Sequence, residues 1–143
     1  AGLVAITPAA GYIQPIMAIP IGAGVSVLCY CMMILRPKTG IDESLDVWAV
    51  HGMGGTWGAL ATGLFCSVAV NPQGKNGLFY GNPKQLLFQL IGVVTVWVFA
   101  FGMTWIIGKF VNKVIGLRVS QEEESIGLDI LQHGERAYGG QLR

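Results

Sequence analysis

Residues 85–108 read QLLFQLIGVVTVWVFAFGMTWIIG and contain no charged side chain. A run of about 18 or more apolar residues with few charges is typical of a helix that crosses a membrane. Lys109 and Lys113 follow this run and lie about one helical turn apart, which suits a helix end among lipid headgroups. The sequence therefore predicts a membrane-spanning helix over residues 85–116.

Two further stretches, residues 1–35 and 47–74, contain no acidic or basic side chain apart from His51. Prolines and a glycine interrupt the first of them, and proline inside a helix removes a backbone hydrogen bond. The apolar run begins at residue 1, so we expect the chain to start inside a helix. The predicted elements are the end of one helix over 1–9, a turn around 10–14, and helices over about 15–35 and 47–70.

The composition agrees with a membrane protein. Only 12% of the 143 residues are charged, whereas a soluble domain has about 25%. So few charges cannot cover the surface of a soluble globule, and a net charge of +1 is not the basic excess of a nucleic-acid-binding protein. These values argue against a soluble enzyme and against a nucleic-acid partner. The predicted fold class is all-α, a polytopic membrane helix bundle.

The basic residues predict how the helices are oriented. In this arrangement five of them fall on one side of the membrane and two on the other, and the cytoplasmic side carries the excess of Lys and Arg. The five are Arg36, Lys38, Lys109, Lys113 and Arg118, and the two are Lys75 and Lys84. We therefore divide the chain into a transmembrane region over 1–117 and a cytoplasmic C-terminal tail over 118–143.

The tail has a helix signal of its own. Ser120 and Glu123 have the spacing of a capping box, and three glutamates fall in the first helical turn. Gly127 is placed to end that helix. We expect a short docked segment here, and a solvated, disordered tail is the alternative.

His51 is the only ionisable residue between Asp46 and Lys75. Its position in the predicted helix places it about one turn below the membrane surface. Ionisable groups at that depth face the protein interior or a water-filled cavity and mark pathways. A structural histidine bonded to a neighbouring helix fits the residues equally well. Val47 lies one turn earlier and shares a face with His51.

The other sequence patterns do not indicate a reactive or cofactor-binding site. Gly54 and Gly58 form a G-x-x-x-G pair, which allows two membrane helices to approach closely. A dinucleotide-binding loop would need a preceding strand and an acidic residue about 20 positions later, and neither is present. The cysteines have neither metal nor disulfide spacing. We expect no metal, no cofactor and no catalytic residue. The four tryptophans are interpreted as packing or interface aromatics: Trp48, Trp57, Trp97 and Trp105.

Three segments resemble the ammonium transporters (the Amt/MEP/Rh family). GLVAITPAAG at residues 2–11 is similar to a signature stretch of the family, and DVWAVHG at 46–52 to its later pore-histidine helix. The third segment resembles the family's cytoplasmic tail, with GLRV at 116–119, the glutamate run, GLD at 127–129 and HGERAY at 133–138. The resemblance covers nearly the whole chain in family order. It implies the C-terminal part of an eleven-helix fold, assembled as a homotrimer with one pore in each subunit.

The resemblance also implies roles for particular residues. His51 corresponds to the second histidine of the pore pair, Val47 lines the pore one turn toward the cytoplasm, and Thr7 lies near the conduction path. Asp46 sits at the cytoplasmic mouth, where the family meets a PII-type regulatory protein. The tail packs across the cytoplasmic face and couples neighbouring subunits.

The implied function is transport of ammonium or ammonia, with methylammonium as an analogue, through a hydrophobic pore. The protein is then not an enzyme but a multi-pass protein of the cell membrane, with the lipid bilayer around it. The alternatives are an ammonium sensor and a structural membrane subunit with a packing histidine.

Overall fold

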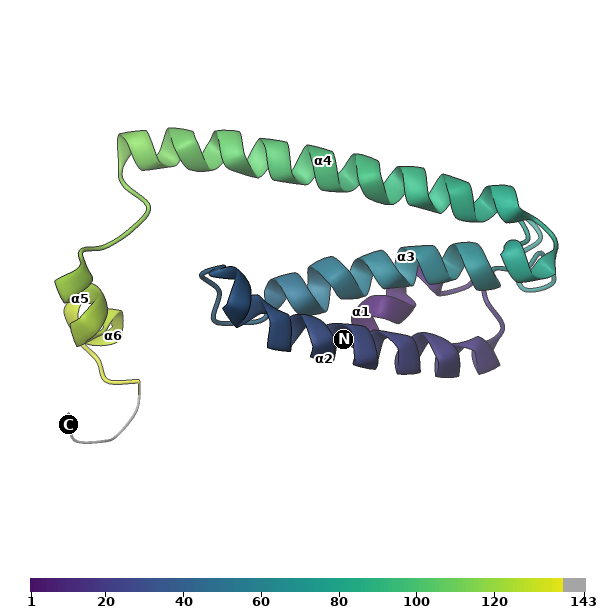
Figure 1. The fold of residues 1–143 in the computed structure, drawn as a ribbon, viewed down its shortest axis with the longest axis horizontal. Helices are drawn as coiled ribbons and strands as arrows, with labels where there is room; N and C mark the ends of the chain where they lie inside the picture. Colours follow the sequence, from purple (N-terminus) through teal and green to yellow (C-terminus); the bar gives the residue numbers. More distant parts are fainter. Residues whose placement is uncertain (138–143) are drawn as a thin grey trace. The chain divides into compact units, whose positions relative to one another are not determined.

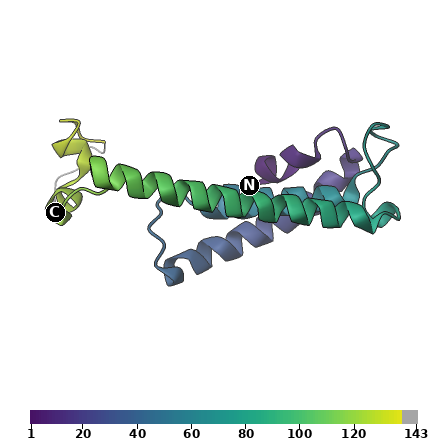
Figure 2. The ribbon, with the colours of Figure 1, turned by 90° about the horizontal axis from the view of Figure 1, so that it is seen from above.

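A computed structural model describes residues 1–137 of the chain and divides it into two units, Ala1–Val98 and Phe99–Arg143. Every named element among the described residues is a helix. Figures 1 and 2 show α1, α2 and α3 of the first unit packed side by side. The predicted all-α fold class is confirmed for the described residues.

The chain begins with α1 (Gly2–Ile6), which continues into the 3-10 helix η1 (Thr7–Ala9). A second 3-10 helix, η2 (Pro15–Met17), leads into α2 (Ala18–Thr39). Proline occupies the first position of η2 and the second position of η1, both within the first turn, where proline is well tolerated. The turn predicted around residues 10–14 lies between them, with Gly11 in the left-handed region at φ 77°.

The helix α2 runs four residues beyond its predicted end at Leu35. The hydroxyl of Thr39 donates to the carbonyl of Arg36 at 2.7 Å, and Gly40 adopts the left-handed conformation with φ 71°. A left-handed glycine directly after the last turn is a common helix end. The glycine of the Arg-Pro-Lys-Thr-Gly run, rather than its proline, therefore ends the helix.

The helix predicted over 47–70 differs at both ends. It begins as a π-helix, η3 (Trp48–Met53), continues as α3 (Gly54–Phe65), and stops before an extended Cys66 with ψ 146°. Ser67 N–H donates to the Tyr12 carbonyl at 2.9 Å, and Gly77 N–H donates to the Cys66 carbonyl at 2.8 Å. The expected continuation to Val70 is wrong because these pairings with distant segments take the backbone groups that a longer helix would use.

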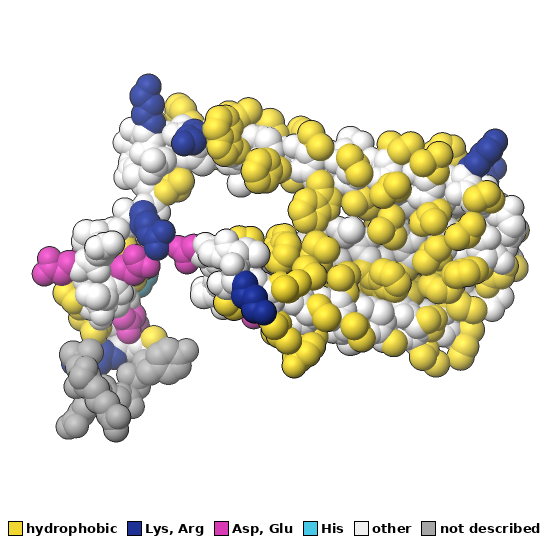
Figure 3. All heavy atoms as spheres, in the orientation of Figure 1, with side chains coloured by type: hydrophobic (Ala, Val, Ile, Leu, Met, Phe, Trp, Pro, Cys, Tyr) yellow, Lys and Arg dark blue, Asp and Glu magenta, His cyan; other side chains and the backbone are white. Residues whose placement is uncertain are grey.

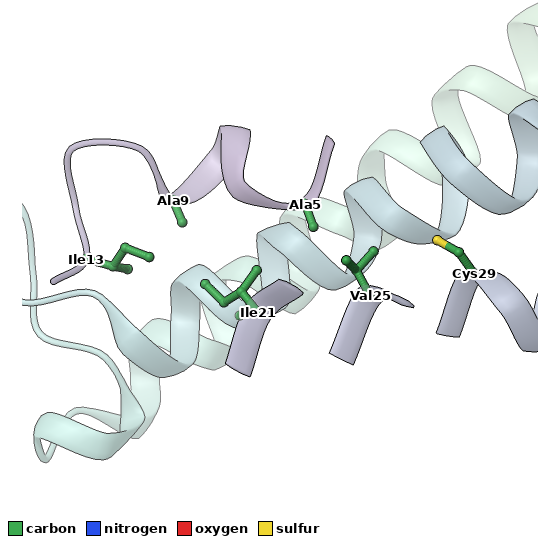
Figure 4. Close-up of a cluster of buried hydrophobic side chains, with 7 residues drawn as sticks. Ala5, Ala9, Ile13, Ile21, Val25 and Cys29 are labelled. Carbon is green, nitrogen blue, oxygen red and sulfur yellow. The ribbon is translucent and has the colours of Figure 1, made fainter. Parts of the chain in front are cut away.

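Small residues bring the helices of the first unit together. In Figure 4 the side chains of Ala5, Ile21, Val25 and Cys29 lie in one apolar cluster between α1, α2 and α3. A Cβ placed on Gly58 would meet the backbone carbonyl of Ala5, so α1 and α3 touch at backbone distance. The close approach predicted from the glycine pair is therefore present at Gly58.

The helix α4 (Pro83–Val114) follows η4 (Leu78–Tyr80) and matches the span predicted over 85–116 to within two residues. Two helical segments of the described chain are long and apolar enough to cross a membrane, Pro15–Thr39 and Pro83–Val114. Figure 3 shows hydrophobic side chains covering the long helices, with lysine and arginine side chains near helix ends.

The second unit contains the end of α4 and two short helices, α5 (Gln121–Ile126) and α6 (Leu128–Leu131). The capping box is confirmed, because Ser120 N–H donates to the Glu123 carboxylate at 2.8 Å and Glu123 N–H donates to the Ser120 hydroxyl at 3.3 Å. Gly127, at φ 106°, separates the two helices. Tyr138, the last residue of the tail motif, lies outside the described residues.

Candidate functional site

His51 lies in the π-helix η3. Gly54 N–H donates to the carbonyls of Ala49 and His51, and the bond to Ala49 spans five residues instead of the usual four. In a regular helix seven residues turn through about 700°, which would place His51 within about 20° of Gly58. Gly58 is buried against α1, whereas His51 is exposed. The extra residue in the π turn thus rotates the imidazole away from the packed face.

Val47 lies at the entrance to the same π-helix as His51. Val47 has helical angles (φ −61°, ψ −42°) and directly precedes the π-helix, four residues before His51. Its side chain is 48% exposed. The two side chains therefore lie about one turn apart and are both free of contacts that would bury them in the first unit.

Thr7 belongs to another element, η1, which continues α1. Its side chain is exposed, and its hydroxyl donates to the Leu3 carbonyl at 2.7 Å. The structure thus gives this hydroxyl a partner within its own helix rather than at the π turn.

Asp46 occupies an unusual backbone position at the entrance to η3. Its φ of 53° is the only positive value at a non-glycine residue in the described chain, and aspartate tolerates this region better than most residues. Its carboxylate forms an ion pair with the Arg36 guanidinium at 3.1 Å, with side-chain exposures of 28% and 19%. The predicted partner-contact residue is therefore also a link between the end of α2 and the start of η3.

Glu43 strengthens the same link. Its carboxylate accepts a hydrogen bond from Trp48 N–H at 2.6 Å, and Arg36 donates to its backbone carbonyl. A negative charge at a helix N-terminus is favourable because the first N–H groups lack helical partners. Glu43 is not among the predicted site residues, although an acidic residue five positions before a helix start is a sequence signal for this contact.

A second connection reaches the π turn from α4. Trp97 Nε1–H donates to the Thr56 hydroxyl at 2.9 Å, and that hydroxyl donates to the Gly52 carbonyl at 2.8 Å. Trp57 packs against the apolar cluster as expected. Its Nε1–H also donates to the Ile21 carbonyl at 2.9 Å. The interpretation of Trp97 as a packing or interface aromatic does not include this polar contact, which no spacing in the sequence indicates.

The described residues contain no group of three or more His, Cys, Asp or Glu side chains placed to hold a metal ion. The polar contacts at the two ends of η3 are instead made by a carboxylate, a backbone carbonyl, a hydroxyl and the paired charges at the helix entrance. These contacts stabilise both ends of the helical turn that carries His51.

Comparisons with known proteins place the chain in a family. Residues 1–138 match the Ammonium Transporter Family. An ammonium transporter of Bacillus subtilis is 46% identical over 139 residues, which are 96% of this chain and 34% of that protein. The ammonium transporter Amt1 of Archaeoglobus fulgidus is 50% identical over 138 residues, 96% of this chain and 35% of that protein.

Solved structures agree with this match. The crystal structure of Saccharomyces cerevisiae Mep2 has a TM-score of 0.82 and 31% identity, over 97% of this chain and 33% of that one. The chain spans about a third of the length of the relatives that it matches. The resemblance seen in the sequence motifs is confirmed, since the family match covers nearly every residue: the chain belongs to the ammonium transporter family.

Proposed function

We propose that the full-length protein conducts ammonium or ammonia across the cell membrane through a hydrophobic pore, and that His51 lines this pore. The observation that carries the proposal is the π turn, which directs the imidazole away from the face that α1 buries. Membership of the ammonium transporter family gives the substrate class. Val47, one turn before His51, and Thr7 on η1 are the other proposed pore-lining residues.

The chemistry of imidazole suits this role. A neutral imidazole has one donor and one acceptor, so it can accept a hydrogen bond from an ammonium N–H or relay its proton. A bare cation in apolar surroundings is costly, and ammonium lowers that cost by giving up a proton. Potassium has no proton to give. A narrow apolar pore with a neutral histidine thereby discriminates between the two ions.

The surroundings of the pore are part of the same proposal. The protein spans the lipid bilayer several times as a homotrimer, and the tail from residue 118 lies in the cytoplasm and couples the subunits. A PII-type regulator meets the cytoplasmic mouth near Asp46. Because Asp46 is paired with Arg36, replacing it will disturb the entrance to η3 as well as any partner contact.

The test is His51→Ala in the full-length protein reconstituted in liposomes, with methylammonium uptake and proton current as readouts. We expect a reduced rate or a loss of discrimination against potassium. His133→Ala, at the other histidine of the chain, is the matched control and should keep the selectivity. Unchanged flux and selectivity in His51→Ala would remove the pore role.

The same preparations separate the alternative functions. Growth rescue of a strain that lacks ammonium uptake supports transport over sensing. Liposomes that show no ammonium-dependent flux with the unaltered protein would instead favour a structural membrane subunit.

A further inference from the structure

The two hydrogen bonds that join Trp97, Thr56 and Gly52 can run in only one direction. An indole N–H is a donor with no acceptor, so the Thr56 oxygen must accept from it. The single hydroxyl proton of Thr56 is then left for the Gly52 carbonyl. Trp97 belongs to α4 and Gly52 to η3. The indole that donates to the Thr56 hydroxyl therefore comes from another helix, 41 residues from Thr56 along the chain.

A side-chain donor lies at the exit of the π turn. Gly54 N–H bonds to the carbonyls of Ala49 and His51, whereas a regular helix would direct it to Val50. Thr56 supplies a side-chain donor to Gly52, the residue directly after His51. Glu43 performs the corresponding task at the entrance by accepting from Trp48 N–H.

The apolar surroundings of Trp97 and Thr56 raise the cost of losing either hydrogen bond. The helix α4 has no buried residue in the described chain, and its contacts with α3 include Leu86 and Gln89 near Gly63 as well as Trp97 at Thr56. In apolar surroundings an unpaired N–H or hydroxyl is costly. Hydrogen bonds in series also polarise and strengthen one another.

We propose that Trp97 and Thr56 are positioning residues for His51. The indole orients the hydroxyl, the hydroxyl holds the Gly52 carbonyl, and the carbonyl keeps the π turn that directs the imidazole into the pore. This proposal rests on the proposed pore role of His51.

The test compares variants of the full-length protein in liposomes. Trp97→Phe removes the donor and keeps a ring, and Thr56→Val removes the hydroxyl at nearly constant shape. Thr56→Ser restores the hydroxyl. The matched controls are Trp105→Phe on the same helix and Thr95→Val, because the Thr95 hydroxyl donates within its own helix, to the Ile91 carbonyl. Each variant is assayed for methylammonium uptake and for the ¹⁵N resonances of labelled histidine.

We expect Trp97→Phe and Thr56→Val to lower uptake about three- to tenfold, the range that one or two interhelical hydrogen bonds in a membrane supply. Thr56→Ser and both controls should behave like the unaltered protein. The double variant should be no slower than the slower single variant, because both changes break one chain of bonds. The His51 resonances should shift in Trp97→Phe and not in Trp105→Phe.

Unchanged uptake and unchanged His51 resonances in both Trp97→Phe and Thr56→Val would overturn the positioning role. Equal losses in the controls would overturn it too, since the effect would then be general. His51→Ala in the same series separates the two proposals. If that variant conducts normally, the pore role fails and the positioning role falls with it. If that variant is impaired while Trp97→Phe and Thr56→Val conduct at the unaltered rate, only the positioning role fails.

Discussion

Adding one methyl group to Gly58 should destabilise the protein, while the same change at Gly54 should not. A Cβ on Gly58 would meet the backbone carbonyl, Cα and carbonyl carbon of Ala5, the last two at 2.9 Å. Backbone atoms cannot rotate away, so α1 and α3 must separate. A Cβ on Gly54 would meet Val25 Cγ2 at 3.4 Å and Cys29 Sγ at 3.5 Å, which is ordinary contact.

The magnitude follows from two opposing terms. Overpacking costs about 1–3 kcal/mol, and replacing glycine by alanine in a helix returns at most about 1 kcal/mol. Gly58→Ala should therefore lose about 1–2 kcal/mol and Gly54→Ala should lose nothing or gain slightly. The assay is the thermal midpoint of the purified full-length protein, with a fall of roughly 1–2 °C for Gly58→Ala. Equal midpoints for the two variants would refute the close packing of α1 on α3.

Two further predictions concern charged residues. Arg36→Gln should lower the free energy of unfolding by about 1 kcal/mol, measured by thermal unfolding of the full-length protein, because it breaks a partly exposed ion pair. Combined with Asp46→Asn it should cost less than the sum of the single changes, and strict additivity would contradict the pairing. The pKa of Glu123 lies below its ordinary value because Ser120 donates to its carboxylate from the backbone and the side chain. This contribution to α5 is complete above the ordinary carboxyl range and is lost as pH falls through the lowered pKa. The protection factors of the amides in residues 121–126, taken relative to the unfolded chain at the same pH, should therefore fall in acid and in Glu123→Ala but not in Glu122→Ala. Protection factors that do not change with pH would count against the capping box.

Local chemistry explains which parts of the fold the sequence predicts. The helix over Pro83–Val114 follows from an uncharged run long enough to cross a membrane. The capping box at Ser120 needs only residues three positions apart. In each case neighbours along the chain determine the structure, so periodicity and spacing are sufficient.

The remaining features depend on partners that are distant along the chain. The stop at Phe65 requires Tyr12 and Gly77 to take the backbone groups around Cys66 and Ser67. The bond from Trp97 to Thr56 joins residues of two different helices. An apolar run looks the same with or without such contacts, so hydropathy alone predicts a helix to Val70.

The candidate site divides in the same way. His51 stands out in the sequence because it is an ionisable residue within an apolar helix. The π turn that directs it is not indicated, since Gly52, Gly54 and Gly55 permit several backbone paths. The capping of η3 by Glu43 depends on where that helix begins and is visible only in the folded chain.

The most direct test of the account is the ammonium-dependent current through the full-length protein with His51 replaced by alanine, measured in liposomes beside a potassium gradient. The account predicts that the variant loses ammonium current, or gains a potassium current that the unaltered protein lacks. An ammonium current of unaltered size with potassium still excluded would contradict the assignment of His51 to the pore.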